Sequence, residues 1–104
     1  MNYEDRVTKE YVEGLLPQLV WGTYVGNGDS VRTIDLGYRP RLLVVLKWGF
    51  GLTEGSNVCG GVCTSDYDTN AVTLVDNGFR VYYNNSGGLT SNTRTGTYLY
   101  LALK

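Results

Sequence analysis

The stretch from Ile34 to Leu46 constrains the fold more than any other part of the 104-residue chain. A strand that alternates apolar and polar residues is predicted over 31–36, and a turn with Gly37 and Pro40 follows it. The next residues, 42–48, are almost all apolar, which is typical of a strand buried on both faces. The pattern predicts a corner where the chain leaves a half-exposed strand and crosses the middle of a small β domain.

The remaining sequence beyond residue 18 is also strand-like. Fourteen glycines against two prolines, together with nine tyrosines, are typical of short strands joined by tight turns. Asp76-Asn77-Gly78 is a strong hairpin signal. We therefore predict that residues 18–104 form a mainly β domain, an antiparallel β-sandwich of about six or more strands. The strands are predicted over 20–25, 31–36, 42–48, 71–75, 79–83 and 98–103.

Two segments of this domain differ from the others. The last predicted strand is apolar on both faces, with leucines on one face and Tyr98, Tyr100 and Ala102 on the other. The connection 49–70 is long and rich in glycine. Connections of that length are usually functional or hold a short extra strand.

Residues 1–17 have a helical pattern instead. Acidic residues in the first turn and Pro17 at the end are typical of helix boundaries. A helix of about 14 residues is marginal in isolation, so its apolar stripe must be buried against something. We expect it either to dock on its own domain or to serve oligomerisation or attachment. The residues of the stripe are Tyr3, Val7, Tyr11 and Leu15.

Charge and hydropathy exclude several classes of partner. The formal net charge is −1, so the basic surface that binds a phosphate backbone is not expected, and neither is a nucleic-acid partner. No apolar run approaches the ~18 residues of a membrane helix, and no signal-peptide pattern opens the sequence. We expect a protein made in the cytoplasm, without membrane insertion, or one that reaches the outside by a route that needs no signal, such as cell lysis.

The chain contains no histidine. Histidine is the commonest general base, the commonest metal ligand and the usual partner of a nucleophilic serine or cysteine. Its absence argues against most hydrolases and zinc enzymes. We therefore expect no enzymatic activity, no cofactor and no metal site.

Cysteine and aspartate were the remaining candidates for chemistry. The spacing of Cys59 and Cys63 does not match zinc knuckles or thioredoxin-like sites. A disulfide is one alternative, if the protein ends up outside the cell; the alternative that we favour is two reduced, partly buried thiols.

Asp66, Asp68 and Asp76 offer oxygen ligands for calcium. The segment lacks the glycine and distal glutamate of an EF-hand loop, so we expect these aspartates to be solvated.

Several motifs occur in a recognisable order. They are the glycine- and tyrosine-rich segment 22–28, the corner 34–40 with its apolar strand, the hairpin residues 78–81 and the final segment 96–102. This order resembles a module of bacteriophage and prophage structural proteins, chiefly tail-fibre and other tail-tip components. Residues 3–11 also resemble the start of small prophage proteins from Gram-positive bacteria. The resemblance implies a virion protein with a lectin-like β-sandwich of the trimeric kind used at fibre tips.

One group of residues has the chemistry of a carbohydrate site. Tyr82 and Tyr83 are adjacent, so one side chain points into the core and the other points out. An exposed aromatic ring beside amide and hydroxyl groups suits a sugar, which stacks its C–H face and donates and accepts through its hydroxyls. The predicted ligand-binding residues are Trp48, Arg80, Tyr82, Tyr83, Asn84 and Asn85.

The leading hypothesis is a non-enzymatic phage or prophage virion protein that works as a homo-oligomer, with a trimer favoured. We expect it in a tail fibre or tail tip, with host-surface glycan as a candidate ligand and other virion proteins as partners. One alternative is a head-decoration or tail-completion subunit that joins neighbours. Another is a small cytosolic domain that sequesters a ligand.

Overall fold

The computed structural model describes residues 19–104. The helix predicted over residues 1–17, with its stripe of Tyr3, Val7, Tyr11 and Leu15, lies outside the described residues. The described part is mainly β, with ten strands in two sheets. In sequence order the strands are β1 (Leu19–Val25), β2 (Val31–Asp35), β3 (Leu42–Lys47), β4 (Thr53–Glu54), β5 (Asn57–Val58), β6 (Gly61–Thr64), β7 (Val72–Val75), β8 (Gly78–Asn84), β9 (Leu89–Thr90) and β10 (Thr97–Leu103).

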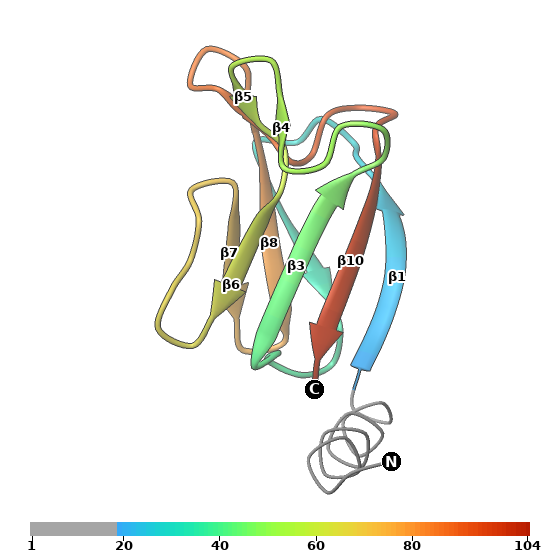
Figure 1. Cartoon of the computed structure of the whole chain (residues 1–104), viewed down its shortest axis with the longest axis vertical. Helices are drawn as coiled ribbons and strands as arrows, with labels where there is room; N and C mark the ends of the chain where they lie inside the picture. Colours follow the sequence, from blue (N-terminus) through green and yellow to red (C-terminus); the bar gives the residue numbers. More distant parts are fainter. Residues whose placement is uncertain (1–18) are drawn as a thin grey trace, which may run out of the picture.

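The first sheet has the strand order β1-β10-β3-β6, and all of its pairings are antiparallel. It faces the viewer in Figure 1. The second sheet has the order β2-β8-β9-β5-β4, and β7 also pairs with β8. One of its contacts, between β5 and β9, is parallel. All six predicted strands are therefore confirmed, and the connection 49–70 holds the three short strands β4, β5 and β6.

The inner faces of the two sheets contribute to one core. Leu43 and Val45 of the first sheet and Phe79 and Val81 of the second are fully buried in the same cluster. The ring of Tyr24 in β1 lies 5.9 Å from the ring of Phe79 in β8, centroid to centroid. Contacts of this kind between the sheets bury the apolar side of each.

The predicted corner is present and carries the chain from one sheet to the other. Strand β2 ends at Asp35, and Gly37 adopts a φ of 83°, which glycine tolerates best. The Gly37 amide donates to the Asp35 carboxylate at 2.8 Å. Pro40 is fully buried. Strand β3 then enters the middle of the first sheet, between β10 and β6.

Strand β3 differs from its prediction in one respect. Its alternate residues Leu43 and Val45 are fully buried, but Leu42, Val44 and Leu46 on the other side are only half-buried. The expectation of burial on both faces is wrong within residues 19–104, because this part of the chain places no second layer over the outer side of the first sheet.

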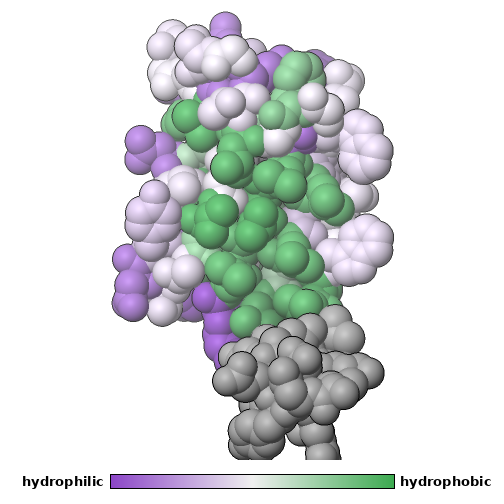
Figure 2. All heavy atoms as spheres, in the orientation of Figure 1, coloured by the Kyte–Doolittle hydropathy of each residue, from purple (hydrophilic) through white to green (hydrophobic). Residues whose placement is uncertain are grey.

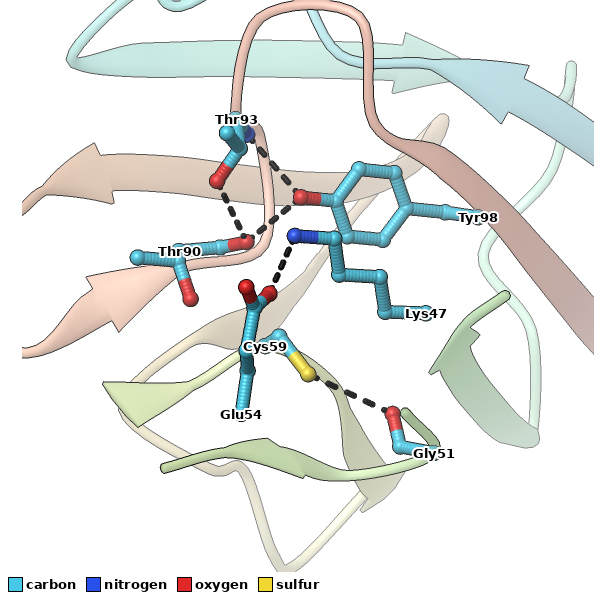
Figure 3. A network of polar contacts seen from close by, with 7 residues as sticks. All are labelled: Lys47, Gly51, Glu54, Cys59, Thr90, Thr93 and Tyr98. Carbon is cyan, nitrogen blue, oxygen red and sulfur yellow. Dashed lines mark hydrogen bonds and ion pairs between the residues drawn. The ribbon is translucent and has the colours of Figure 1, made fainter. Parts of the chain in front are cut away.

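A stacked pair of tyrosines in the core fixes the segment that follows β9. The rings of Tyr24 and Tyr98 lie 4.8 Å apart and nearly parallel. The Tyr24 hydroxyl donates to the carbonyl of Ser91 at 2.7 Å, and the Tyr98 hydroxyl donates to the carbonyl of Thr90 at 2.5 Å. The amide of Thr93 donates back to the Tyr98 hydroxyl at 3.0 Å. Two tyrosines of the first sheet therefore hold backbone that continues from the second; Figure 3 shows the contacts of Tyr98 with Thr90 and Thr93.

Candidate functional site

The outer side of the first sheet is the most distinctive surface among residues 19–104. Successive side chains of a strand point to opposite faces, and the core takes Tyr24, Leu43, Tyr98 and Ala102. The alternate residues therefore point outward, and none of them is charged. We call this surface the apolar face. Besides threonines it consists of Leu19, Trp21, Val25, Leu42, Val44, Leu46, Val62, Leu99, Leu101 and Leu103.

Figure 2 shows these side chains as a continuous hydrophobic area over β3, β10 and the neighbouring strands. The register explains the continuity, because Leu101 lies opposite Trp21 on one side and opposite Val44 on the other. Leu101 is 38% exposed and Trp21 is 71% exposed. The face is thus a row of cross-strand apolar contacts that remains open to solvent.

Strand β10 shows how the sequence produces this face. Its tyrosines and alanine point inward, and its leucines point outward. Close packing enforces the arrangement: the Tyr100 ring lies over Gly22, where a side-chain carbon would approach its hydroxyl oxygen to 2.7 Å. A larger residue at Gly22 would displace the ring, so β1 and β10 are matched in shape on the inner side.

An open hollow of about 320 Å³ lies at the end of the apolar face next to the turn after β3. The aromatic side chains that line it are Trp48, 70% exposed, and Phe50, 54% exposed. Leu46 and Leu99 form its apolar floor. The turn is rigid because its backbone is bonded at several points: the Lys47 amide donates to the Gly51 carbonyl at 2.8 Å, and the Trp48 amide donates to the Thr97 carbonyl at 2.8 Å.

On the inner side of the same turn, Lys47 forms an ion pair with Glu54 (Figure 3). Burial lowers the pKa of Lys47, but the hydrogen bond to Glu54 and the nearby Tyr98 outweigh this effect, so the pKa lies above its usual value. The lysine is therefore charged at neutral pH. Lys47 also lines the hollow, and its Nζ lies 5.1 Å from the centre of the Phe50 ring. The other side chains that line the hollow are apolar.

The two cysteines are buried and are not joined by a disulfide. The thiol of Cys59 donates to the Gly51 carbonyl at 3.4 Å, and the thiol of Cys63 donates to the Val72 carbonyl at 3.1 Å. Burial raises the pKa of both thiols. Both are therefore core residues with low reactivity, as the favoured reading of the sequence expected.

The structure places the predicted sugar-binding residues on two different sheets. Trp48 follows β3 of the first sheet, whereas Arg80, Tyr82, Tyr83 and Asn84 belong to β8 of the second. None of the β8 residues lines the hollow beside Trp48. Asn85, which follows β8, is exposed. The structure therefore groups five of the six residues in and beside one strand and leaves Trp48 apart from them.

Several of the β8 residues already have structural roles. Tyr83 lies on the inner side, and Tyr82 on the outer side has its hydroxyl 2.8 Å from the Thr73 hydroxyl. The side-chain oxygen of Asn84 accepts from the Gly87 amide at 3.0 Å and thereby closes a turn. Arg80 is exposed on the outer side. In this group Arg80 and Asn85 have the freest access to a ligand.

The three aspartates considered as calcium ligands have different contacts. Asp68 accepts from the Leu74 amide at 3.3 Å, and Asp76 lies 3.8 Å from the Arg39 guanidinium. Asp66 is exposed. Within residues 19–104, no three side chains of the types His, Cys, Asp and Glu are grouped so that they could hold a metal ion. The same residues include no helix with the length and hydropathy to span a membrane.

Sequence reasoning missed Trp21 and Phe50. A signal for Trp21 was available: it occupies alternate positions with Leu19 and Thr23 in a strand whose other side carries Gly22 and Tyr24. Phe50 lies in the long connection, where no periodicity indicates the direction of its side chain.

Comparison of the chain with protein-family models, with curated proteins and with solved structures finds no significant match.

Proposed function

We propose that the chain is a non-enzymatic structural subunit of a bacteriophage or prophage particle, at the tail tip or in a tail fibre. The observation that carries the proposal is the uncharged apolar face of the first sheet. Single proteins rarely expose continuous apolar patches larger than a few hundred Å² unless the patch binds something. A surface of this kind suits a subunit that is packed against other protein.

The motif order supports the choice of assembly. Segments 22–28, 34–40 and 96–102, which resemble tail-fibre and tail-tip modules, lie in β1, in the corner between the sheets and in β10. We also propose that the two sheets form an antiparallel β-sandwich of the lectin-like type, which their shared core supports. The lack of histidine supports a non-catalytic role.

The test is to look for the protein in particles. Phage particles induced from a host that encodes the chain are purified and analysed by mass spectrometry, and antibody-labelled gold locates the protein by electron microscopy. We expect the protein at a fixed copy number with label at the tail tip. Label on the head would instead favour a decoration subunit, and particles without the protein would refute the proposal.

A second function, binding of host-surface glycan, is favoured by the exposed pair Trp48 and Phe50 on a rigid turn. Sugar rings stack their C–H faces on aromatic side chains. The chain offers a matched control: Trp21 and Trp48 are equally exposed, but only Trp48 lines the hollow.

Binding is measured on a glycan array and then by titration with the sugars that bind. Trp48→Ala should reduce binding by at least about tenfold, which is the scale of one lost stacking contact. Trp21→Ala should leave it unchanged. Equal losses in both variants, or an array without binding, would reject the hollow as a glycan site. Arg80→Ala tests the separate group on β8 in the same assay.

A further inference from the structure

We infer that the apolar face is covered by the same face of other copies of this chain. The inference rests on the proposed function in one respect, since both treat this face as a protein contact, and it adds the identity of the partner. Three features of the described residues support it: the composition of the face, its size, and the contrast with the opposite surface of the molecule.

The composition is that of a protein interior. Outward positions of β1, β3, β6 and β10 are leucine, valine, tryptophan and threonine, without one charged side chain. Interfaces that form and dissolve are usually about as polar as the rest of the surface, whereas permanent homo-oligomers bury surfaces that resemble a core cut in half. A second copy is the partner that is always present when the chain folds.

The apolar face is too wide for a single helix to cover. Four strands about 4.8 Å apart, with seven residues of about 3.3 Å in the longest, span roughly 19 by 23 Å. A helix is about 10–12 Å across with its side chains, so one helix of the kind predicted in residues 1–17 covers only about half of this width. Another sheet, packed about 10 Å away, covers all of it.

The outer side of the second sheet is an unfavourable partner for the apolar face, so the apolar faces of separate copies are expected to contact each other. The outer side of the second sheet carries Asp35 on β2 and Arg80 on β8, and both are exposed. A contact between unlike faces would bury these charges against leucine and valine, which is costly when no partner charge is supplied. Contact between two apolar faces buries no charge. Two copies can stack their faces, or three can surround a common axis with the faces inward.

The flat area of the face, roughly 440 Å², is about half of the ~800 Å² that each partner buries in a standard interface. Trp21 belongs to the face, Trp48 lies beside it, and both are highly exposed. Tryptophan is enriched among the residues that dominate binding energy. The composition is that of a permanent interface, but the area is small, so we expect an oligomer whose population depends on protein concentration, with Trp21 inside the contact and Trp48 at its edge.

The experiment measures the mass of the full chain by light scattering and sedimentation at increasing concentration. We expect a shift from 11.5 kDa to an integer multiple of that mass. Leu101→Glu places a charge at the centre of the face and should weaken association by more than about tenfold. Thr33→Glu, an exposed position on the second sheet, should associate like the parent. Circular dichroism verifies that each variant is folded.

A second measurement tests whether the faces are alike, and it remains informative if Leu101→Glu does not fold. Leu101→Cys should join to its counterpart through a short bis-maleimide linker, whereas the parent, whose thiols are buried, should not. A full chain that stays monomeric overturns the inference. So does an oligomer that resists Leu101→Glu or that fails to cross-link. Particles that contain a protein monomeric in solution would keep the proposed function and refute this inference alone.

Discussion

The outer sides of the two sheets are opposite in character, although their inner sides form one core. On the first sheet the outward residues are uncharged, and Leu101 and Trp21 are open to solvent. On the second sheet Asp35 and Arg80 are exposed, and Tyr82 bonds to a neighbouring threonine. The outer side of the second sheet carries the charged and hydrogen-bonded side chains that are usual on a protein surface, whereas the outer side of the first sheet is apolar. This contrast is the basis of the proposal that the outer side of the first sheet packs against other protein.

The largest expected effect tests whether the two sheets depend on the same core. Phe79 of β8 is fully buried and contacts Tyr24 and Tyr100 of the first sheet. Phe79→Ala should lower the free energy of unfolding by about 3–5 kcal/mol, because it removes buried apolar area and leaves a cavity.

Urea unfolding is followed by tryptophan fluorescence, which reports on the first sheet, and by circular dichroism, which reports on both. The two signals should shift together in Phe79→Ala. If fluorescence kept its original midpoint while circular dichroism moved, the sheets would unfold separately and the idea of a shared core would fail.

An intermediate effect is expected at Tyr98, which connects the sheets by hydrogen bonds. Tyr98→Phe removes the donor to the Thr90 carbonyl and the acceptor of the Thr93 amide. The Thr90 carbonyl still accepts from the Thr93 hydroxyl at 3.2 Å, so the Thr93 amide is the group that loses its partner. Leaving a buried polar group without a partner costs about 1–3 kcal/mol. Tyr100→Phe, on the same inner side of β10 but half-buried, is the control and should cost clearly less. Equal costs in the two variants would mean that the Tyr98 bonds contribute little.

The smallest effect belongs to the polar outer side. Tyr82→Phe breaks the contact with the Thr73 hydroxyl between β8 and β7. The expected loss is below about 1 kcal/mol, since cross-strand pairs on exposed surfaces contribute little. Thr73→Val in the Tyr82→Phe background should add almost nothing, because the partner hydroxyl is already gone. A loss as large as that of Tyr98→Phe would contradict the distinction between inner and outer positions.

Much of the fold was predictable because it follows from local chemistry. Gly37 and Pro40 marked the corner, Asp76-Asn77-Gly78 marked the hairpin, and six strands were found from strand-like segments, either alternating or continuously apolar, between turn signals. The short strands β4, β5 and β9 were not identified, since two residues carry no periodicity, and β6 was expected only as a short extra strand somewhere in the connection 49–70. The assignment of strands to sheets was also out of reach, because β10 pairs with strands far away in the sequence.

The candidate site was less predictable, and β10 shows why. Alternation separated its tyrosines from its leucines, but it could not say which set faces the core. A leucine face is expected to be buried, yet here the tyrosines are inside: the Tyr98 hydroxyl donates to the Thr90 carbonyl, and the Tyr100 ring packs against Phe79. Trp48 was predicted as a ligand-binding residue together with residues of β8, but the aromatic residue that lines the hollow with it is Phe50, two residues on.

The position of β10 also affects how the protein is made. It is the last strand in the sequence, yet it lies between β1 and β3 and joins them (Figure 1). On the ribosome both neighbours emerge before it, while the β7–β8 hairpin can already form from residues close together in the chain. Until residues 97–103 are synthesised, β1 has no partner in the sheet and β3 can pair only with β6 on its other side. A nascent chain that stops before Thr97 would therefore be prone to aggregate through the unpaired edges of these strands.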